Sequence, residues 1–541
     1  MYAEKLYKNG KFYTMEQEGQ AVEAVGVRDG KIVFTGTNEE AEKIESDEII
    51  DIKGRAVFPG FIDCHQHTLA YARTTKEVNL VGTKSVQDIL DRLKERAKVT
   101  PPGDWIKGSG FNHEEFDEVR IPTKEELDSV SKECPILISR YCMHVHAANS
   151  KALEIAGIDE NFKPIVPDSV EYGADGKPNG ILRESAVTPV LKSIPDLLPT
   201  PEDKKDALEV VCRDMNRYGI TGIHPIQGKF VDADEYMNLY QELEEEGRLP
   251  VRVYLSFDEY PSFHMKTGFG NEKLRYGFYK IYSDGSLGSR NAALTEDYSD
   301  DPGNKGLLNH SPEEVMEMCQ KAYDMDLQIG IHAIGDRGVE IALDALENCY
   351  RKNPKPNVRF RLIHGIVLRK DLIERIKKMP IIVDIQPRFT SNYNIWWSED
   401  RLGPERIRYA YAWNTLIKEG IILTGSSDSP VEPYSPMLGV YSIVCRQDLT
   451  GKPEGGWYPK ERVSVYDAIS MYTRNAAYSS YEEDIKGTIT VGKLADFAVM
   501  EEDPFTVDPL HIKDIRVMQT WLGGEKVYEA EYLPDWRTLC Y

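Results

Sequence analysis

Several motifs that would mark a class of function are missing from this sequence. The eight cysteines form no CxxC pair, which argues against a zinc ribbon or a dithiol redox motif. Neither GxGxxG nor GxxxxGK(S/T) occurs, so the glycine-rich phosphate loops are absent as well. No apolar run approaches the roughly 20 residues that span a bilayer, and the start, MYAEKLYKNGKFYTM, lacks the order of a signal peptide. We therefore expect a cytoplasmic protein whose thiols are free and mostly buried.

Positive charge is also in short supply. The 541 residues include 66 Lys and Arg against 89 Asp and Glu, a formal net charge of -23. This balance argues against a nucleic-acid surface, and no polybasic stretch is available to attract an anionic membrane. We expect the partner to be a small-molecule substrate. The sequence is compatible with either a monomer or a homodimer. With 41% hydrophobic residues, the chain is long enough for one large domain and a smaller one.

Both ends of the chain have the texture of short β-strands. Near the start, runs such as KLYKNGKFYTM and AVEAVGVRDGKIVFTG alternate around NG and DG turns, and a similar pattern returns near the end in GTITVGKLADFAVM. A long stretch of different character separates them. We predict one composite β-sandwich domain made from residues 1–58 and 485–541.

Between these ends, short apolar strands alternate with amphipathic helical stretches, which is the pattern of repeated βα units. The strand candidates are VFPGFID, GITGIHP, RVYLSF, FYKIYSDG, LQIGIHA, FRLIHG, IIVDIQP and IILTGSSD. Eight such strands predict an α/β fold, a (β/α)₈ TIM barrel over residues 59–484. A ninth candidate, PILISRYC, falls in an insertion at about 71–201, after the first barrel strand. An open doubly wound sheet is the alternative, but its phosphate loop is missing.

The first barrel strand carries two histidines with one residue between them. In FPGFIDCHQHTL, His65 and His67 share a face of the strand with Asp63 below them. Two convergent imidazoles are half of a site for a borderline metal ion. By itself the HxH spacing is weak evidence for a metal site, because paired histidines on a strand are also found as structural polar residues that bind no metal.

Two later strands also end in a histidine. In QIGIHA, His332 shares its side with Gly330 and Gln328, so we expect it to face the barrel interior. In RLIHG we expect His364 to face the interior and Ile363 to face outward. Each histidine alone is better explained as a satisfied core residue. Two successive strands ending this way favour function, because catalytic groups in this fold lie at the C-terminal ends of the strands.

The last and the fourth barrel strands each contribute a charged residue. The strand in IILTGSSDSPV ends at Asp428, which is either a turn or helix-capping residue or a carboxylate that binds metal and accepts a proton. In YGFYKIYSDG, Lys280 has the parity of Tyr282 and Asp284. An inward lysine must be paired, deprotonated or chemically changed. A salt bridge to Asp284 or Asp428 and a carbamate formed with carbon dioxide both satisfy this requirement.

Taken in order, five of these segments resemble a known family. FPGFIDCHQH, KIYSDGSLGSR, IHAIGD, LIHG and SSDSPV resemble the amidohydrolase superfamily, and more closely amidohydrolase family 3, the YtcJ-like proteins related to N-substituted formamide deformylases. The resemblance runs nearly end to end. It includes HVHAANSKALEIAGI in the insertion and WLGGEKVYE near the C-terminus.

The resemblance implies roles for the residues at the strand ends. The implied metal ligands are His65, His67, Lys280 as a bridging carbamate, His332, His364 and Asp428. The first histidine pair would bind the more buried ion and the later two the more exposed one, while Asp428 would also act as general base. One or two divalent ions are implied, with zinc as first choice and manganese, iron or cobalt as alternatives.

The implied reaction is hydrolysis of a C–N bond. Metal-activated hydroxide would attack the carbonyl carbon of an amide, N-formyl or cyclic amide compound. Alternatives on the same site are ester hydrolysis and a hydration reaction. A further alternative is a catalytically inactive, ligand-binding barrel.

Other residues are candidates for contacts with substrate. His144, before the NSKAL segment, is predicted to touch substrate and the oxyanion, whereas His146 is expected to be structural. Arg290 and Asp284 are further candidates, although Arg290 fits a surface salt bridge equally well. His224, at the end of the second strand, is expected to support a metal ligand.

An aromatic group follows the seventh barrel strand. In PRFTSNYNIWW, we predict that Trp396 and Trp397, with Phe389 and Tyr393, bind an apolar or aromatic part of the substrate. The alternative is packing against the insertion or a second subunit.

Overall fold

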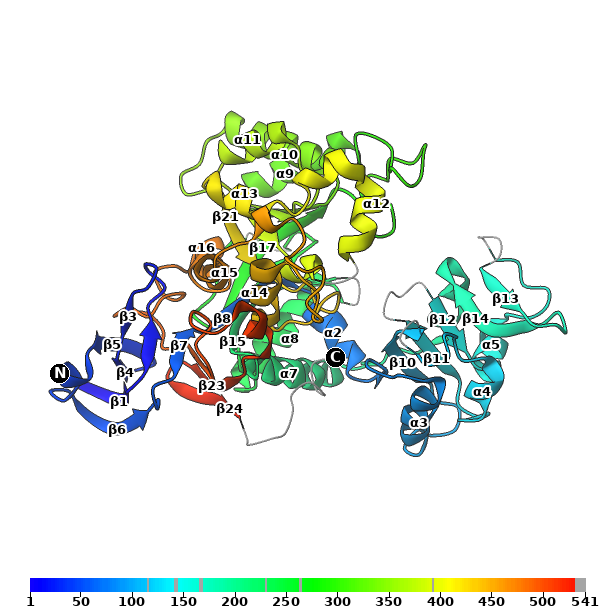
Figure 1. Cartoon of the computed structure of the whole chain (residues 1–541), viewed down its shortest axis with the longest axis horizontal. Coiled ribbons are helices and arrows are strands. Elements are labelled where there is room, and N and C mark those ends of the chain that lie inside the picture. Colours follow the sequence, from blue (N-terminus) through cyan, green and yellow to red (C-terminus); the bar gives the residue numbers. More distant parts are fainter. Residues whose placement is uncertain are drawn as a thin grey trace. The chain divides into compact units, whose positions relative to one another are not determined.

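The chain divides into two compact units in the computed structural model (Figure 1). The structure describes residues 1–113, 116–140, 145–164, 169–228, 231–261, 265–391 and 394–530. Among the described residues, the first unit contains 1–69 and 208–530, and the second contains 70–207. The predicted domain boundaries at 58, 59, 484 and 485, and the insertion at about 71–201, stay predictions.

Eight parallel strands form the central sheet of the first unit. They pair in chain order as β8 (Phe61–Gln66), β15 (Ile220–Pro225), β16 (Arg252–Phe257), β17 (Leu274–Tyr282), β18 (Gln328–Ala333), β19 (Phe360–His364), β20 (Ile381–Ile385) and β21 (Ile422–Gly425). The segment that follows β21 also bonds to the end of β8, because Asp428 N donates to His65 O at 2.9 Å and His67 N donates to Ser429 O at 2.8 Å. The eight predicted strands are therefore present, and the predicted TIM-like barrel is confirmed.

Strand burial and helix amphipathicity explain this arrangement. Every residue of β8, β15 and β16 is buried, as expected where side chains fill the barrel on one face and meet helices on the other. After β17 comes α9 (Pro312–Asp324), which begins with a capping box between Ser311 and Glu314. After β18 comes α10 (Asp336–Lys352), whose apolar face is buried. Each strand thus delivers its C-terminal end to the same rim of the barrel.

Two further sheets lie outside the barrel, one built from N-terminal residues alone and one built from residues of both chain ends. The first has the order β5 (Lys31–Gly36), β4 (Ala24–Arg28), β1 (Tyr2–Lys8) and β6 (Glu45–Asp51). The second has the order β24 (Glu525–Glu529), β23 (Val517–Leu522), β22 (Phe497–Met500), β7 (Ala56–Pro59), β2 (Lys11–Tyr13) and β3 (Ala21–Val22). Tyr7 packs edge-on against Phe497 and Trp521, with ring centroids 5.5 and 5.0 Å away. These contacts between early and late residues hold the two ends together.

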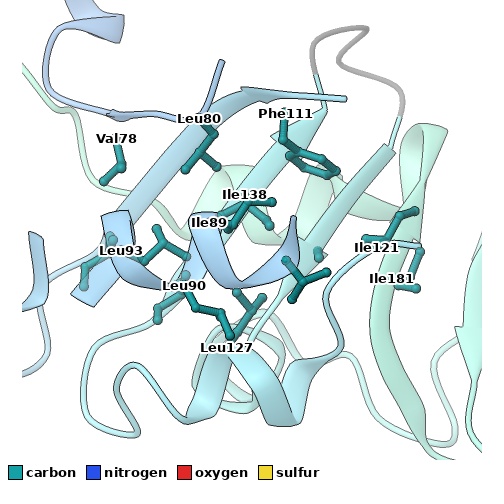
Figure 2. Packing of buried hydrophobic residues seen from close by; sticks show 14 of the residues in the cluster. Val78, Leu80, Ile89, Leu90, Leu93, Phe111, Ile121, Leu127, Ile138 and Ile181 are labelled. Carbon is teal, nitrogen blue, oxygen red and sulfur yellow. The ribbon is translucent and has the colours of Figure 1, made fainter. Parts of the chain in front are cut away.

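The second unit has a sheet and a core of its own. Its strand order is β13 (Val170–Tyr172), β14 (Pro178–Arg183), β12 (Val145–Ala148), β11 (Ile136–Arg140), β10 (Ile106–Phe111) and β9 (Val78–Asn79). Figure 2 shows Ile89, Leu90 and Leu93 of α3 (Val86–Ala97) among the buried side chains of this sheet, including Ile138. The ninth strand candidate is β11 and lies here, outside the barrel. Among the described residues, no helix is both long and apolar enough to cross a membrane.

Candidate metal centre

The histidines of β8 lie beside the carboxylate that follows β21. His65 Nε2 is 3.3 Å and His67 Nε2 is 3.4 Å from the same oxygen, Oδ1 of Asp428. The side chain of His65 is 1% exposed and that of His67 is 25% exposed. One histidine therefore lies in the barrel interior and the other at its rim.

The histidines of β18 and β19 adjoin this group. The His364 ring centroid is 4.5 Å from that of His332 and 5.5 Å from that of His65. One ligand atom from each of His65, His364 and Asp428 lies within 4.8 Å of the other two. The barrel thus brings together residues that are far apart in the sequence, as its closure requires.

The predicted orientation of β19 is wrong in one respect. Ile363 was expected to face outward, but it packs against Phe278, and the Arg361 guanidinium lies 4.5 Å from the centre of the same ring. Arg361 and Ile363 are therefore the inward residues of this strand. His364 reaches the centre because its φ of 74° turns the backbone out of the strand conformation. Strand alternation cannot reveal such a turn.

Lys280 on β17 is a buried amine beside His65. Its Nζ lies 3.5 Å from His65 Nε2 and 5.0 Å from the centre of the Tyr282 ring. Among the described residues no carboxylate oxygen lies within 4.0 Å of Nζ, so neither expected salt bridge is formed. Burial lowers the pKa of Lys280 to about 7.

The protonation states of the centre suit a divalent cation. Burial, together with Lys280, holds the pKa of His65 well below its usual value, and burial lowers the pKa of His364 to about 4. For Asp428, burial acts to raise the pKa, but hydrogen bonds with His65 and His67 outweigh it and lower the pKa. Neutral imidazoles and an ionised carboxylate are the donor set that zinc and similar ions accept.

Asp63 links β8 to the segment after β21, but it is not a member of the group formed by His65, His364 and Asp428. Its carboxylate accepts hydrogen bonds from the backbone N and the Oγ of Ser427, at 3.1 and 2.6 Å, and from His65 N at 3.3 Å. These bonds fix the segment that carries Asp428 against β8. Asp428 itself has a φ of 56°, a left-handed conformation that an aspartate tolerates better than most residues.

A layer of buried polar side chains contacts the same strands. Arg361 donates to Asp384 Oδ2 at 2.7 Å and to Cys64 O at 2.7 Å, and its Nη1 is 3.2 Å from His224 Nδ1. Thr424 donates to the other oxygen of Asp384. Arg361 and Asp384 were missed, although a charged residue inside each apolar strand was a signal that could have found them.

The predicted substrate residues have varied surroundings. Arg290 pairs with both oxygens of Asp300, at 3.1 and 2.7 Å, as its alternative interpretation anticipated. The Asp284 carboxylate accepts N–H bonds from Ala293, Ile334 and Gly335, and its Oδ1 is 3.5 Å from His332 Nε2. Their contacts with substrate stay predictions.

The remaining candidates lie in α12, in the second unit or outside the described residues. In α12 (Asn394–Arg406), Trp396 is 52% exposed, and the Arg401 guanidinium lies 4.5 Å from the centre of the Trp397 ring. His144 and Tyr393 lie outside the described residues. His146 Nδ1 is 2.9 Å from Ser139 Oγ within the second unit.

The fold and the centre together define a class of protein. Neutral histidines and a carboxylate at the C-terminal ends of the strands of a parallel barrel are the arrangement of a metal-dependent hydrolase. Residues 48–528 match the family described as the amidohydrolase family. The chain therefore belongs to the amidohydrolase family, and it is a hydrolase.

Individual relatives agree with this assignment. The chain is 36% identical over 534 residues to the putative amidohydrolase YtcJ of Bacillus subtilis (strain 168), covering 97% of this chain and 99% of that protein. It is 26% identical over 540 residues to the N-substituted formamide deformylase of Arthrobacter pascens, covering 96% and 97%. The crystal structure of an uncharacterized metal-dependent hydrolase from Pyrococcus horikoshii OT3 matches with a TM-score of 0.74 and 29% identity, covering 94% and 99%.

Proposed function

We propose that this hydrolase cleaves a C–N bond in an amide, N-formyl or cyclic amide compound of small size. The observation that carries the proposal is the convergence of His65, His364 and Asp428 within 4.8 Å at the rim of the barrel. The similarity to an N-substituted formamide deformylase supports the choice of bond.

The chain's own residues would hold one or two divalent ions, with zinc as first choice. The ligands would be His65, His67, His332, His364 and Asp428, joined by Lys280 as a carbamate. When bound, such an ion supplies Lewis acidity, which lowers the pKa of water and polarises a carbonyl group.

Asp428 would move the proton. Its ionised carboxylate lies between His65 and His67, and its low pKa keeps an acceptor oxygen available. It would take a proton from the attacking water and return it to the leaving nitrogen, so that the amine departs neutral.

Lys280 would become an anion by reaction with carbon dioxide. The neutral Nζ forms a bond to the carbon of carbon dioxide, one N–H proton leaves to solvent, and a carbamate remains. A pKa near 7 leaves much of the amine unprotonated at neutral pH, and no described carboxylate competes for it. The new negative charge would offset the positive charge of the ions.

One assay tests both the type of bond that the protein cleaves and the role of Asp428. Protein loaded with zinc or manganese is offered N-formyl amines, simple amides and lactams, each beside its matched ester, and release of amine or alcohol is measured. We expect turnover of at least one nitrogen series. Asp428→Asn should lower kcat by about 100-fold or more, whereas Asp29→Asn, with a side chain 85% exposed, should match the wild type. Turnover of esters alone, or undiminished turnover in Asp428→Asn, would overturn the proposal.

A further inference from the structure

Gln386 lies directly after β20 and contacts His364. Its Oε1 is 2.6 Å from His364 Nδ1. Its Nε2 donates to Ser426 Oγ at 3.0 Å and, more weakly, to Asp384 O at 3.4 Å. Gln386 is 1% exposed, so these partners take the place of water.

The partners of the amide fix which way it points. Ser426 Oγ gives its own proton to Ile385 O at 2.9 Å, so it accepts from Gln386, and the carbonyl of Asp384 can only accept. Reversing the amide would place Oε1 against that carbonyl. The amide NH₂ therefore faces Ser426 and Asp384, and Oε1 faces His364.

The direction of the amide sets the tautomer of His364. Oε1 is an acceptor, so Nδ1 of His364 must carry the proton that bridges the 2.6 Å contact. A neutral imidazole has one N–H, which leaves Nε2 with the lone pair. The same ring packs edge-on against His332 and His65, so the contact with Gln386 is one of several that orient it.

We propose that Gln386 is a positioning residue for metal binding, because it holds His364 as the Nδ1–H tautomer with Nε2 free to bind an ion. The inference rests on the proposed metal role of His364. Ser426 is the second member of this arrangement, since it holds the amide of Gln386. An amide does this without adding charge, whereas a carboxylate at the same place would make the centre more negative.

The test measures metal affinity directly, with no substrate present. Metal-free protein is titrated with Zn²⁺ against a competing chelator, and Co²⁺ is added separately to record its visible absorption bands. Gln386→Met has a similar length but no acceptor, so we expect about 10- to 100-fold weaker Zn²⁺ binding and altered Co²⁺ bands. Gln386→Glu keeps the acceptor for Nδ1–H, and the Ser426 hydroxyl can turn from Ile385 O to donate to the second carboxylate oxygen, so this variant should bind Zn²⁺ within about 3-fold of the wild type. Gln519→Met, in β23 of the terminal sheets, is the matched control and should leave both readouts unchanged.

The outcomes separate this inference from the proposed function. If the wild type binds neither ion, the proposed metal-dependent reaction fails. If the wild type binds but Gln386→Met binds equally well with the same Co²⁺ bands, only the inference is overturned. Should Gln386→Met not fold in its metal-free form, the other variants decide. Weaker binding in Ser426→Ala together with near-native binding in Gln386→Glu supports the inference, and any other pairing overturns it.

Discussion

At the scale of the residue, Lys280 is a buried amine with no described carboxylate partner. Its amine is buried, it lies 3.5 Å from a neutral histidine, and no described carboxylate lies within 4.0 Å. A protonated amine in this place would be poorly stabilised, which is why burial lowers its pKa. A large fraction of the amine is therefore neutral near pH 7, and a neutral amine can react as a nucleophile.

This chemistry predicts chemical rescue. Lys280→Ala should lower the metal content, and it should lower turnover by at least about 100-fold, because the proposed bridging carbamate would be lost. Added acetate or propionate should restore part of both, since a free carboxylate can occupy the space of the carbamate. Metal analysis and kinetics at increasing carboxylate concentration measure the effect.

Lys273 provides a matched control for the rescue. It lies just before β17, and burial lowers its pKa to about 8, so it is a partly buried lysine with a weakened charge. It lies at the N-terminal end of the strand, away from the centre. Lys273→Ala should keep its metal and show no response to carboxylates. Full metal content in Lys280→Ala would contradict the proposed carbamate.

At the scale of the element, the end of β19 decides where His364 lies. His364 and Gly365 have φ values of 74° and 54°, so two consecutive residues adopt the left-handed conformation. A Cβ added at Gly365 would lie 3.0 Å from Val383 Cγ1 of the neighbouring strand. A side chain at this position would require Val383 to shift by a few tenths of an ångström.

We predict that Gly365→Ala will both destabilise the fold and weaken metal binding. The left-handed backbone costs about 1 to 2 kcal/mol for alanine, and relief of the contact with Val383 should displace His364. Gly420→Ala is the control, because Gly420 has a φ of 77° with nothing within 4 Å of an added Cβ. Urea unfolding should reveal a loss in both variants, and Zn²⁺ titration a loss in Gly365→Ala alone. Equal affinities would indicate that this strand end does not position the ligand.

At the scale of the whole molecule, a buried ion pair joins the barrel to the terminal sheets. Arg252 of β16 donates to both oxygens of Asp496, at 2.7 and 2.9 Å, just before β22. Burial acts to raise the pKa of Asp496, but the charge of Arg252 outweighs it and the pKa is lowered. The ion pair is therefore fully formed at neutral pH.

The lowered pKa predicts a pH-dependent contribution to stability. Because the folded-state pKa lies below the unfolded value of about 3.9, the contribution is present above pH 4 and is lost as pH falls through the folded-state pKa. Asp496→Asn should cost about 3 kcal/mol at pH 7. The difference from the wild type should shrink below pH 4, as denaturant titrations at several pH values would measure. A difference that grows on acidification would contradict this account.

The two units should respond to core mutations separately. Leu127 is fully buried in the core of the second unit, and Leu343 in α10 is fully buried in the first. Each change to alanine should cost about 2 to 5 kcal/mol. Hydrogen exchange with mass spectrometry should detect lost protection within 70–207 for Leu127→Ala and within the barrel for Leu343→Ala. Loss spread evenly over both units in either variant would contradict their independence.

The barrel strands and the residues of the centre differ in how well they could be predicted from the sequence. All eight barrel strands could be recognised, because a strand buried on both faces is apolar throughout and ends at a turn. The polar residues His65, His332 and Asp428, at or just after strand ends, could also be recognised, because the strands that precede them are mainly apolar. The inward face of β19 was misassigned, because a single left-handed residue reverses the alternation. Gln386 was missed, because a glutamine after a strand has no distinctive spacing.

The strands, their order and the chemical types at their ends can be predicted from the amino-acid sequence, since these depend on local polarity and short-range geometry. Which of these side chains meet is visible only in the folded barrel. Lys280 and His65 are 215 positions apart, and Ser427 and Asp63 are 364 apart, yet each pair is in contact. The neutral state of the histidines, the weakened charge of Lys280 and the tautomer of His364 follow from burial and from neighbours on other strands. Such interactions act through space, and closure of the barrel creates them.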